Sequence, residues 1–355
     1  QCVATECALG YYPDGSGCTA FASHTIEQDW DRRTYDISLG VGPSGLPQLA
    51  YQVETYDDLK VAKSAANWAW STETVAGADY TDVGLHPDLV VDSQNQAHVV
   101  YYDAEEDQLT YARYNTGTQQ WTFEQIFTFS HMFWEDDAAA SIALDSAGNP
   151  HVCFHDEDDE VVYYAKRTTS GWSTPSIIAN ADAYEASPCA IEIASNGRPR
   201  VLYLSSDLLG GSYSMHFATF NGSSWQTETL YNSRATITQR SLALSAEDVP
   251  HVLYADSSNR LTLLSKPGSQ WNSSLISSSE TTPYEVQVDS LGDPHVLWSD
   301  VYGTYYSRRD GSTWIHATLI DTYASTGSMV LDASDHVHMV LVYDENFDTQ
   351  IVHWH

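Results

Sequence analysis

The chain has 355 residues, with 48 Asp and Glu against 15 Lys and Arg, so its formal net charge is −33. This excess of negative charge excludes nucleic acid and anionic membrane surfaces as general partners, because both require a basic footprint. No apolar run approaches the ~20 residues of a membrane-spanning helix. We therefore expect a monomer that does not insert into membranes and that is soluble in a salty or extracellular medium.

Residues 1–18 form a cysteine-rich lead that is too short to fold without cross-links. Its cysteines are Cys2, Cys7 and Cys18. Such clustering predicts at least one disulfide and an oxidising compartment, so we expect a secreted or cell-surface protein. Cys153 and Cys189 lie in consecutive repeats of the following domain, and the odd total of five cysteines leaves the pairing open.

Residues 19–355 repeat one phrase, a hydrophobic strand, an Asp-Ser-x-Gly-x turn and Pro-His-Val. Clear copies read LDSAGNPHVCF (144–154) and VDSLGDPHVLW (288–298). The histidine falls at positions 98, 151, 251, 295 and 338, and Gln48 and Arg200 replace it in two further copies, with steps of 43 to 53 residues. A repeat of this length, made of strands and turns, predicts an all-β seven-bladed β-propeller with four antiparallel strands per blade.

Each repeat contains four strand-like segments. In the third repeat they are 141–146, 150–155, 160–167 and 171–178, all with period-2 alternation and rich in Val, Ile, Tyr or Trp. In six repeats the fourth segment begins near a tryptophan: Trp70, Trp121, Trp172, Trp225, Trp271 and Trp314.

The seventh repeat lacks its fourth segment and stops at IVHWH. Residues 19–28 match the missing strand, with Phe21 at the place of the tryptophan. The N-terminal strand is therefore predicted to complete blade 7, which covers an otherwise exposed sheet edge and closes the ring.

These units resemble the extracellular bacterial propellers built from L-D-x-x-G-x-P-H-V-x-Y repeats, which are distantly related to Asp-box (sialidase-type) propellers. The resemblance covers about residues 19–355 and implies a secreted binding or surface module. Seven-bladed propellers also include polysaccharide lyases that use a His–Tyr pair with an arginine neutraliser. The Asp-box is degenerate here, as in Asp310-Gly-Ser-Thr-Trp314, and no sialidase arginine triad is found, so nothing catalytic carries over.

A residue that recurs in every repeat usually serves the repeat itself. The recurring histidines are therefore predicted to be structural, each making a hydrogen bond that ties its blade to the next strand or turn. They are His98, His151, His251, His295 and His338.

Candidate functional residues lie where the repeats disagree. Aligned inner strands give the column Ser38, Asp88, Ser141, Ala190, Ser241, Glu285 and Ser328, with Glu192 and Gln287 deeper in the channel. Asp88 and Glu285 differ from the small residues of this column, and His86, Arg240 and Tyr284 come just before it. Such a group at a concave mouth predicts a ligand site, the alternative being a water-filled channel with tolerated polar residues.

The loop 130–141 is a second candidate, because it carries Trp134 and Asp136 among further acidic residues. An aromatic ring beside carboxylates suits a stacked sugar, and the alternative is a hydrophobic plug. The carboxylates also suit Ca²⁺, although no calcium-loop motif is present. His353 and His355 alternate along one strand and suit a transition metal. The sequence leaves the cofactor unknown, with Ca²⁺ or a transition metal as the ions its side chains suit.

The sequence thus favours a secreted, lectin-like propeller that binds a glycan or another extracellular ligand at its loop-rich face. The alternative is a carbohydrate-active enzyme of the polysaccharide lyase kind, with or without dependence on a metal ion. In that case His86 or Tyr284 acts as base and Arg240 or a bound cation offsets the uronate charge. A third reading is a structural module displayed through the cysteine-rich lead.

Overall fold

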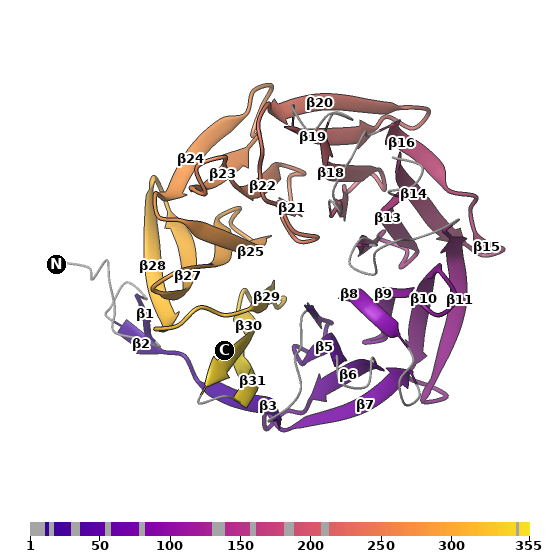
Figure 1. The fold of residues 1–355 in the computed structure, drawn as a ribbon, viewed down its shortest axis with the longest axis horizontal. Helices are drawn as coiled ribbons and strands as arrows, with labels where there is room; N and C mark the ends of the chain where they lie inside the picture. The colour runs from indigo at the N-terminus through magenta and orange to yellow at the C-terminus, as the bar shows by residue number, and fades with distance from the viewer. Residues whose placement is uncertain are drawn as a thin grey trace.

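The computed structural model describes residues 11–13, 18–29, 36–53, 58–77, 82–129, 139–156, 161–180, 188–206, 213–345 and 348–355. Seven blades of antiparallel strands stand around a central channel (Figure 1), which confirms the predicted β-propeller. In the described residues no helix is long and apolar enough to cross a membrane.

Each blade is listed from its inner to its outer strand. Blade 1 contains β4 (Ile37–Val41), β5 (Pro47–Val53), β6 (Asp58–Ser64) and β7 (Trp70–Ala76). Blade 2 contains β8 (Val83–Val91), β9 (Ala97–Asp103), β10 (Gln108–Asn115) and β11 (Gln120–Thr128). Blade 3 contains β12 (Ala140–Leu144), β13 (Pro150–Asp156), β14 (Val161–Thr168), and an outer strand in two pieces, β15 (Gly171–Trp172) and β16 (Ser176–Asn180).

The other blades follow the same order. Blade 4 contains β17 (Ala190–Ile193), β18 (Pro199–Ser206), β19 (Tyr213–Phe220) and β20 (Trp225–Tyr231). Blade 5 contains β21 (Leu242–Leu244), β22 (Pro250–Ala255), β23 (Leu261–Ser265) and β24 (Asn272–Ser277). Blade 6 contains β25 (Thr281–Val288), β26 (Pro294–Asp300), β27 (Gly303–Asp310) and β28 (Thr313–Ile320). Blade 7 contains β29 (Thr326–Leu331), β30 (Val337–Glu345), β31 (Asp348–Trp354) and β3 (Ser23–Asp29).

The ring closes as the sequence predicts, because β3 pairs with β31 from the other end of the chain. Phe21, just before β3, packs edge-on against Tyr306 of blade 6 with ring centroids 5.8 Å apart. Trp172 of blade 3 packs in the same way on Tyr111 of blade 2, at 5.3 Å. Phe21 therefore takes the place of a blade tryptophan, and the N-terminal strand belongs to blade 7.

The hydrophobic core consists of interfaces between consecutive blades. One cluster joins Tyr102 and Tyr111 of blade 2 to Val152 and Phe154 of blade 3. Since each blade buries its faces only against its neighbours, the ring is stable when all blades are present.

Two local features complete the fold. The hairpin of β1 (Tyr11–Pro13) and β2 (Cys18–Ala20) lies beside β28 (Figure 1). Cys153 on β13 forms a disulfide with Cys189, immediately before β17, and so links blades 3 and 4. The sequence left this pairing open.

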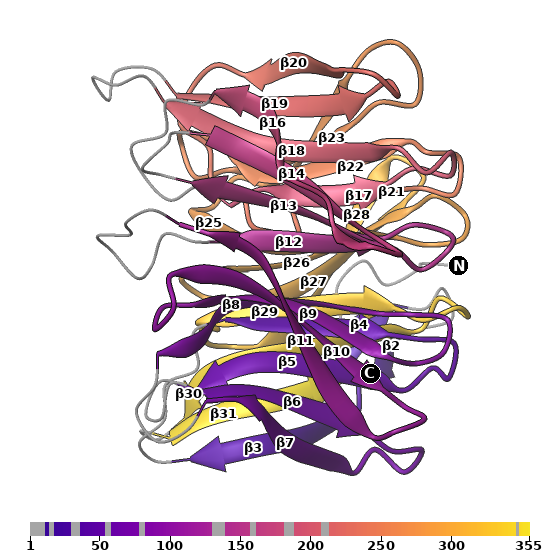
Figure 2. The same cartoon turned by 90° about the vertical axis from the view of Figure 1, so that its right-hand side faces the viewer.

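The ring has two different faces, which appear at the left and right of Figure 2. We call the right-hand one the turn face, because the short turns between first and second strands and between third and fourth strands lie there. The opposite one is the loop face, where chain segments lead into the inner strands. The C-terminal end of β31 lies at the turn face (Figure 2).

Candidate functional site

The inner strands surround a central channel that holds a cavity of about 290 Å³. Its lining includes Asp88, Arg240 and Glu285, three of the residues that the sequence assigns to the channel mouth, and also Glu192. The fold thus brings together side chains from blades 2, 4, 5 and 6.

The column of small and acidic residues on the inner strands forms a belt of hydrogen bonds from blade to blade. The Ser38 hydroxyl accepts a hydrogen bond from the Leu89 amide at 2.8 Å and donates one to Asp88 at 2.9 Å. Asp88 then accepts a hydrogen bond from the Ile142 amide of blade 3 at 2.9 Å. Each of these side chains satisfies a backbone amide of the next blade.

The belt continues on the other side of the channel. Glu285 accepts hydrogen bonds from the Met329 amide and the Ser328 hydroxyl of blade 7, both at 2.8 Å. Ser328 accepts one from the Leu39 amide of blade 1 at 3.0 Å. Asp88 and Glu285 are 5% and 3% exposed. Because buried carboxylates that accept amide hydrogen bonds stabilise a fold, joining neighbouring blades is sufficient to explain both residues.

Arg240 brings positive charge into this channel. Its Nε lies 3.6 Å from Asp88 Oδ1 and 3.8 Å from Glu285 Oε2, which exceeds hydrogen-bond distance. A terminal guanidinium nitrogen approaches the Pro87 carbonyl at 3.5 Å. The side chain is only 13% exposed. The guanidinium therefore offsets the charge of two protein carboxylates and is poorly placed to neutralise an incoming anion.

Carboxylates outnumber this guanidinium in the channel. Burial raises the pKa of Glu285 to about 7, although Arg240 and hydrogen bonds to the carboxylate act in the opposite direction. Burial, together with the charges of Asp88 and Glu285, raises the pKa of Glu192 to about 8. Negative charge is thus already unfavourable here at neutral pH, and the channel disfavours an anionic ligand such as a uronate.

His86 pairs with a residue that the sequence analysis did not select. Its Nδ1 lies 2.5 Å from Asp36 Oδ2. Burial tends to raise the pKa of Asp36, but the hydrogen bond and charge of His86 and the charge of Arg240 outweigh it, so this pKa is lowered. His86 has a left-handed φ of 50° within a bulge of β8. Asp36 had a signal, because it stands two residues before Ser38, as His86 stands two before Asp88.

Gln239, from the segment before β21, spans the channel near His86. Its Nε2 donates to the carbonyls of Ala140 at 2.9 Å and of His86 at 3.4 Å. The Ser141 hydroxyl donates to the Gln239 carbonyl at 3.2 Å. These bonds brace blade 5 against blades 2 and 3, so this polar group also has a structural role.

Tyr284 does not join the channel group. It is 4% exposed in the core between blades 6 and 7. Its hydroxyl donates to the Ala324 carbonyl and shares a hydrogen bond of 2.6 Å with Ser299. Burial raises the pKa of this hydroxyl well above its usual range. The lyase-like combination of Tyr284 with His86 and Arg240 is therefore not assembled in the described residues.

Trp134 and Asp136 lie outside the described residues, since the description stops at residue 129 and resumes at 139. The sugar- or calcium-binding loop of residues 130–141 stays a prediction.

The recurring histidine bridges a turn to a strand within its own blade. His98 Nδ1 lies 2.5 Å from Tyr111 Oη, and its Nε2 lies 3.2 Å from Asp92 Oδ2. Burial lowers the pKa of His98 to about 4, so the ring is neutral at pH 7. The same triad recurs as Asp145, His151 and Tyr164 in blade 3 and as Asp289, His295 and Tyr306 in blade 6. A structural role is confirmed for these three histidines, each of which ties a turn to a strand of its own blade.

Blade 7 departs from this triad, because His353 occupies the place of the tyrosine. His338 Nδ1 lies 3.2 Å from His353 Nε2, and the rings of His353 and His355 stack with centroids 5.1 Å apart. His24 of β3 stacks on His355 at 5.3 Å, and Trp68 of blade 1 packs on it at 4.1 Å. This histidine stack joins β3, β30 and β31 to the turn between β6 and β7.

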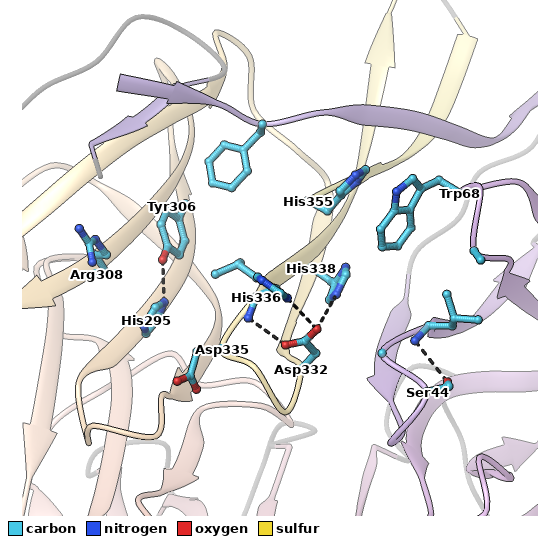
Figure 3. Close-up of a pocket in the computed structure, with 15 residues that line it drawn as sticks. Ser44, Trp68, His295, Tyr306, Arg308, Asp332, Asp335, His336, His338 and His355 are labelled. Atoms are coloured by element: carbon cyan, nitrogen blue, oxygen red, sulfur yellow. Dashed lines mark hydrogen bonds and ion pairs between the residues drawn. The ribbon is translucent and has the colours of Figure 1, made fainter. Parts of the chain in front are cut away.

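A cavity of about 710 Å³ opens beside this stack at the turn face of blades 6, 7 and 1 (Figure 3). We call it the Trp68 cavity. Its lining combines the rings of Phe21, Trp68 and Tyr306 with the polar side chains of Asp332 and His336 and others. Trp68 and His355 lie side by side at one end (Figure 3).

The polar side of the Trp68 cavity is formed by Asp332, His336, His338 and His355. His336, 74% exposed, places Nδ1 3.0 Å from Asp332 Oδ2. The His338 side chain is 3% exposed, and its Nε2 is 3.9 Å from Asp332 Oδ2 and has no hydrogen-bond partner. His355 Nδ1 is likewise buried without one.

The histidine stack does not form a metal centre in this arrangement. In the part of the chain that the structure describes, no group of three or more His, Cys, Asp or Glu side chains is placed to hold a metal ion. The predicted transition-metal site at His353 and His355 is therefore not supported there, and Trp134 and Asp136 lie outside these residues.

Comparison with known proteins gives a fold and no family. No family model matches the sequence, and no curated protein matches it. Several solved structures match over most of their lengths. The α-L-arabinanase of Penicillium chrysogenum, complexed with arabinobiose, is 9% identical over 95% of this chain and 98% of its own, with a TM-score of 0.56.

Two further matches are similar. The SapL1 lectin in complex with α-methyl fucoside is 14% identical over 83% of this chain and 98% of its own, with a TM-score of 0.54. The polysaccharide lyase Uly1 is 7% identical over 87% of both chains, with a TM-score of 0.55. At these identities the matches show the propeller fold alone.

Proposed function

We propose that this chain is a secreted carbohydrate-binding propeller without catalytic activity, and that the Trp68 cavity is its binding site. The observation that carries the proposal is the combination of aromatic rings with the Asp332 carboxylate and the imidazole of His336 in that cavity. Sugars match such a surface, because their C–H faces pack on aromatic rings while their hydroxyls donate to carboxylates and exchange hydrogen bonds with imidazoles.

The size of the cavity agrees with a short saccharide. Its volume of about 710 Å³ falls within the range of roughly 300–1,000 Å³ that is usual for small-ligand sites. Asp332 offers acceptor oxygens, and the His336 ring offers nitrogens that can donate or accept. This mixture favours a neutral sugar over a strongly charged one, as does the net charge of −33.

Context supports an extracellular sugar ligand. The disulfide between Cys153 and Cys189 fits secretion or surface display, since disulfides persist in oxidising compartments. Propellers of this fold include one described as a lectin bound to a fucoside and one as an arabinanase bound to arabinobiose.

The lyase alternative is disfavoured by three placements. Tyr284 is buried with its hydroxyl engaged. Arg240 lies between two protein carboxylates. Glu192 adds further negative charge to the channel. None of these residues meets the needs of a uronate-cleaving site.

Titration calorimetry with methyl α-fucoside, arabinobiose and the methyl glycosides of glucose, galactose and mannose tests the proposal. We expect saturable binding that Trp68→Asn weakens at least tenfold. Asn is chosen because residue 68 has a φ of 61°, which Asn tolerates. The control Tyr302→Ala removes a 75%-exposed aromatic ring from the loop face and leaves binding unchanged.

A second measurement separates binding from catalysis. Incubation with neutral and uronate-containing polysaccharides is expected to release neither reducing ends nor unsaturated products. Turnover would overturn the assignment of a non-catalytic protein, and binding that survives Trp68→Asn in a folded variant would place the site elsewhere.

A further inference from the structure

Neighbouring turns on the turn face are joined by a polar latch at two junctions. Between blades 4 and 5, Asp248 accepts hydrogen bonds from the amide and hydroxyl of Ser195, both at 2.6 Å. Between blades 6 and 7, Asp335 accepts the same pair from Ser290, at 2.9 and 2.5 Å. The serine is the second residue of its turn and the aspartate is the fourth residue of the next turn.

Two other junctions have lost both members of the latch. Between blades 5 and 6 the two positions hold Ala246 and Gly292, and between blades 7 and 1 they hold Ala333 and Gly45. A cavity opens at each of these junctions. Gly45 lines the Trp68 cavity, and Gly292 lines a second cavity of about 560 Å³ between blades 5 and 6.

We propose that this second cavity is another saccharide site, so that the propeller is at least bivalent on its turn face. The proposal rests on the function proposed for the Trp68 cavity, because the same double replacement accompanies both. The two cavities flank blade 6, since Tyr306 lines the Trp68 cavity and Arg309 lines the second one. One saccharide chain lying across this face meets both.

The second cavity has polar groups of both signs. Arg309 lines it and donates through Nε to the Gly311 carbonyl at 3.0 Å. Asp293 lines it too, and burial together with the charge of Asp289 raises the pKa of that carboxyl. A carboxyl under such conditions gains from donated hydrogen bonds, which sugar hydroxyls supply.

His251 adds a further polar group to the wall. It is 5% exposed, and its Nδ1 shares a hydrogen bond of 2.9 Å with the Ser265 hydroxyl. In blades 2, 3 and 6 a turn aspartate lies near the other ring nitrogen, but Ser245 holds that position in blade 5. Hydroxyls, an imidazole, a guanidinium and a carboxyl together suit a neutral saccharide unit.

Rebuilding the latch tests the proposal directly. Ala246→Ser with Gly292→Asn restores it between blades 5 and 6, and Ala333→Ser with Gly45→Asn restores it between blades 7 and 1. Asn accepts the left-handed turn conformation, as Asn95 does at the same position with a φ of 58°. No protein atom lies within 4 Å of a Cβ placed on Gly292.

Gly148→Asn is the matched control. Gly148 is the fourth residue of its turn, and Ser93 is the second residue of the preceding turn, at a junction away from both cavities. Its φ of 78° lies between those of Gly45 and Gly292, at 69° and 86°. It reports the effect of the substitution itself on folding and binding.

Calorimetry with the methyl glycosides of fucose, arabinose, glucose, galactose and mannose gives the readout. We expect about two equivalents bound by the wild type and by Gly148→Asn, about one by either rebuilt latch, and none by the two combined. One equivalent in the wild type, lost only on closing the Trp68 cavity, overturns the second site and leaves the first. No binding of any glycoside to the wild type overturns both.

Discussion

The belt around the channel and the turn face differ in how their polar groups are satisfied. In the belt, Ser38, Asp88 and Glu285 each accept a hydrogen bond from the next blade. On the turn face, His338 and His355 carry buried nitrogens without a hydrogen-bond partner. The belt contains the residues that attract attention in the sequence, yet its chemistry is used within the fold.

This difference shows that a residue that departs from the repeat can have one of two structural effects in this ring. An acidic residue in a column of serines, such as Glu285, performs the serine's task with a longer side chain. A small residue in place of a latch residue, such as Gly45 or Gly292, removes a contact and leaves space. Ligand-binding residues are therefore better sought where the repeat loses a contact between blades than where it gains a charged side chain.

Removing β3 should disrupt both the belt and the turn face, and we expect it to cause the largest loss of stability. A chain starting at residue 30 loses the strand that pairs with β31 and the rings of Phe21 and His24. The unfolding free energy should fall by about 4 kcal/mol or more, because an interface between blades is exposed. Denaturant unfolding measures it, with a chain starting at residue 18 as the control. Equal stability of the two truncated chains would refute closure by β3.

Glu285→Ala breaks the belt alone. The Met329 amide and the Ser328 hydroxyl lose their buried acceptor, so we expect a loss of about 2–4 kcal/mol in unfolding free energy. Affinity for the glycosides at the Trp68 cavity should not change. Glu285→Gln keeps an acceptor oxygen and should cost less. A fully stable Glu285→Ala variant that loses ligand would reverse the roles assigned to the two regions.

The fold could be predicted from the sequence because the same unit of strands and turns recurs along the whole repeat region. Periodic strands, the Pro-His-Val phrase and Phe21 at a tryptophan position determine blade number and closure without any long-range information. The outer strand of blade 3 is an exception in detail, since it breaks into β15 and β16 around Pro175, which has no amide hydrogen to donate to the sheet.

The candidate site was predicted less well, because the burial of a side chain and the direction in which it points depend on how neighbouring blades pack. The column containing Asp88 was identified, but not the approach of the next blade's amide that satisfies it. Tyr284 lies three residues from Gln287 on one strand, yet it lies in the core and not in the channel. Trp68 was not selected, because a single aromatic residue in a turn carries no repeating signal.

The stability of the channel and that of the turn face should also depend on pH in opposite ways. Glu192→Gln tests this difference, and its expected effect on the unfolding free energy is the smallest of the three. Glu192 has a folded pKa of about 8 against an ordinary value near 4.5, so its stabilising contribution is lost as pH rises towards 8. His98, His151 and His338 have folded pKa values of about 4 against 6.5, so their contribution is present at neutral pH and is lost as pH falls from 6.5 towards 4.

Replacing Glu192 by glutamine removes the alkaline loss and leaves the acid loss in place. At pH 8 the full shift corresponds to about 4 kcal/mol. Because Glu192 is only partly buried, solvent screens much of this, so unfolding at pH 8 should show a gain of about 1–2 kcal/mol over the wild type that shrinks to near zero at pH 5. The exposed Glu280→Gln is the control and should change little at either pH. A gain independent of pH would mean that Glu192 acts through packing. In that case its charge would not destabilise the channel, and this property would not distinguish the channel from the turn face.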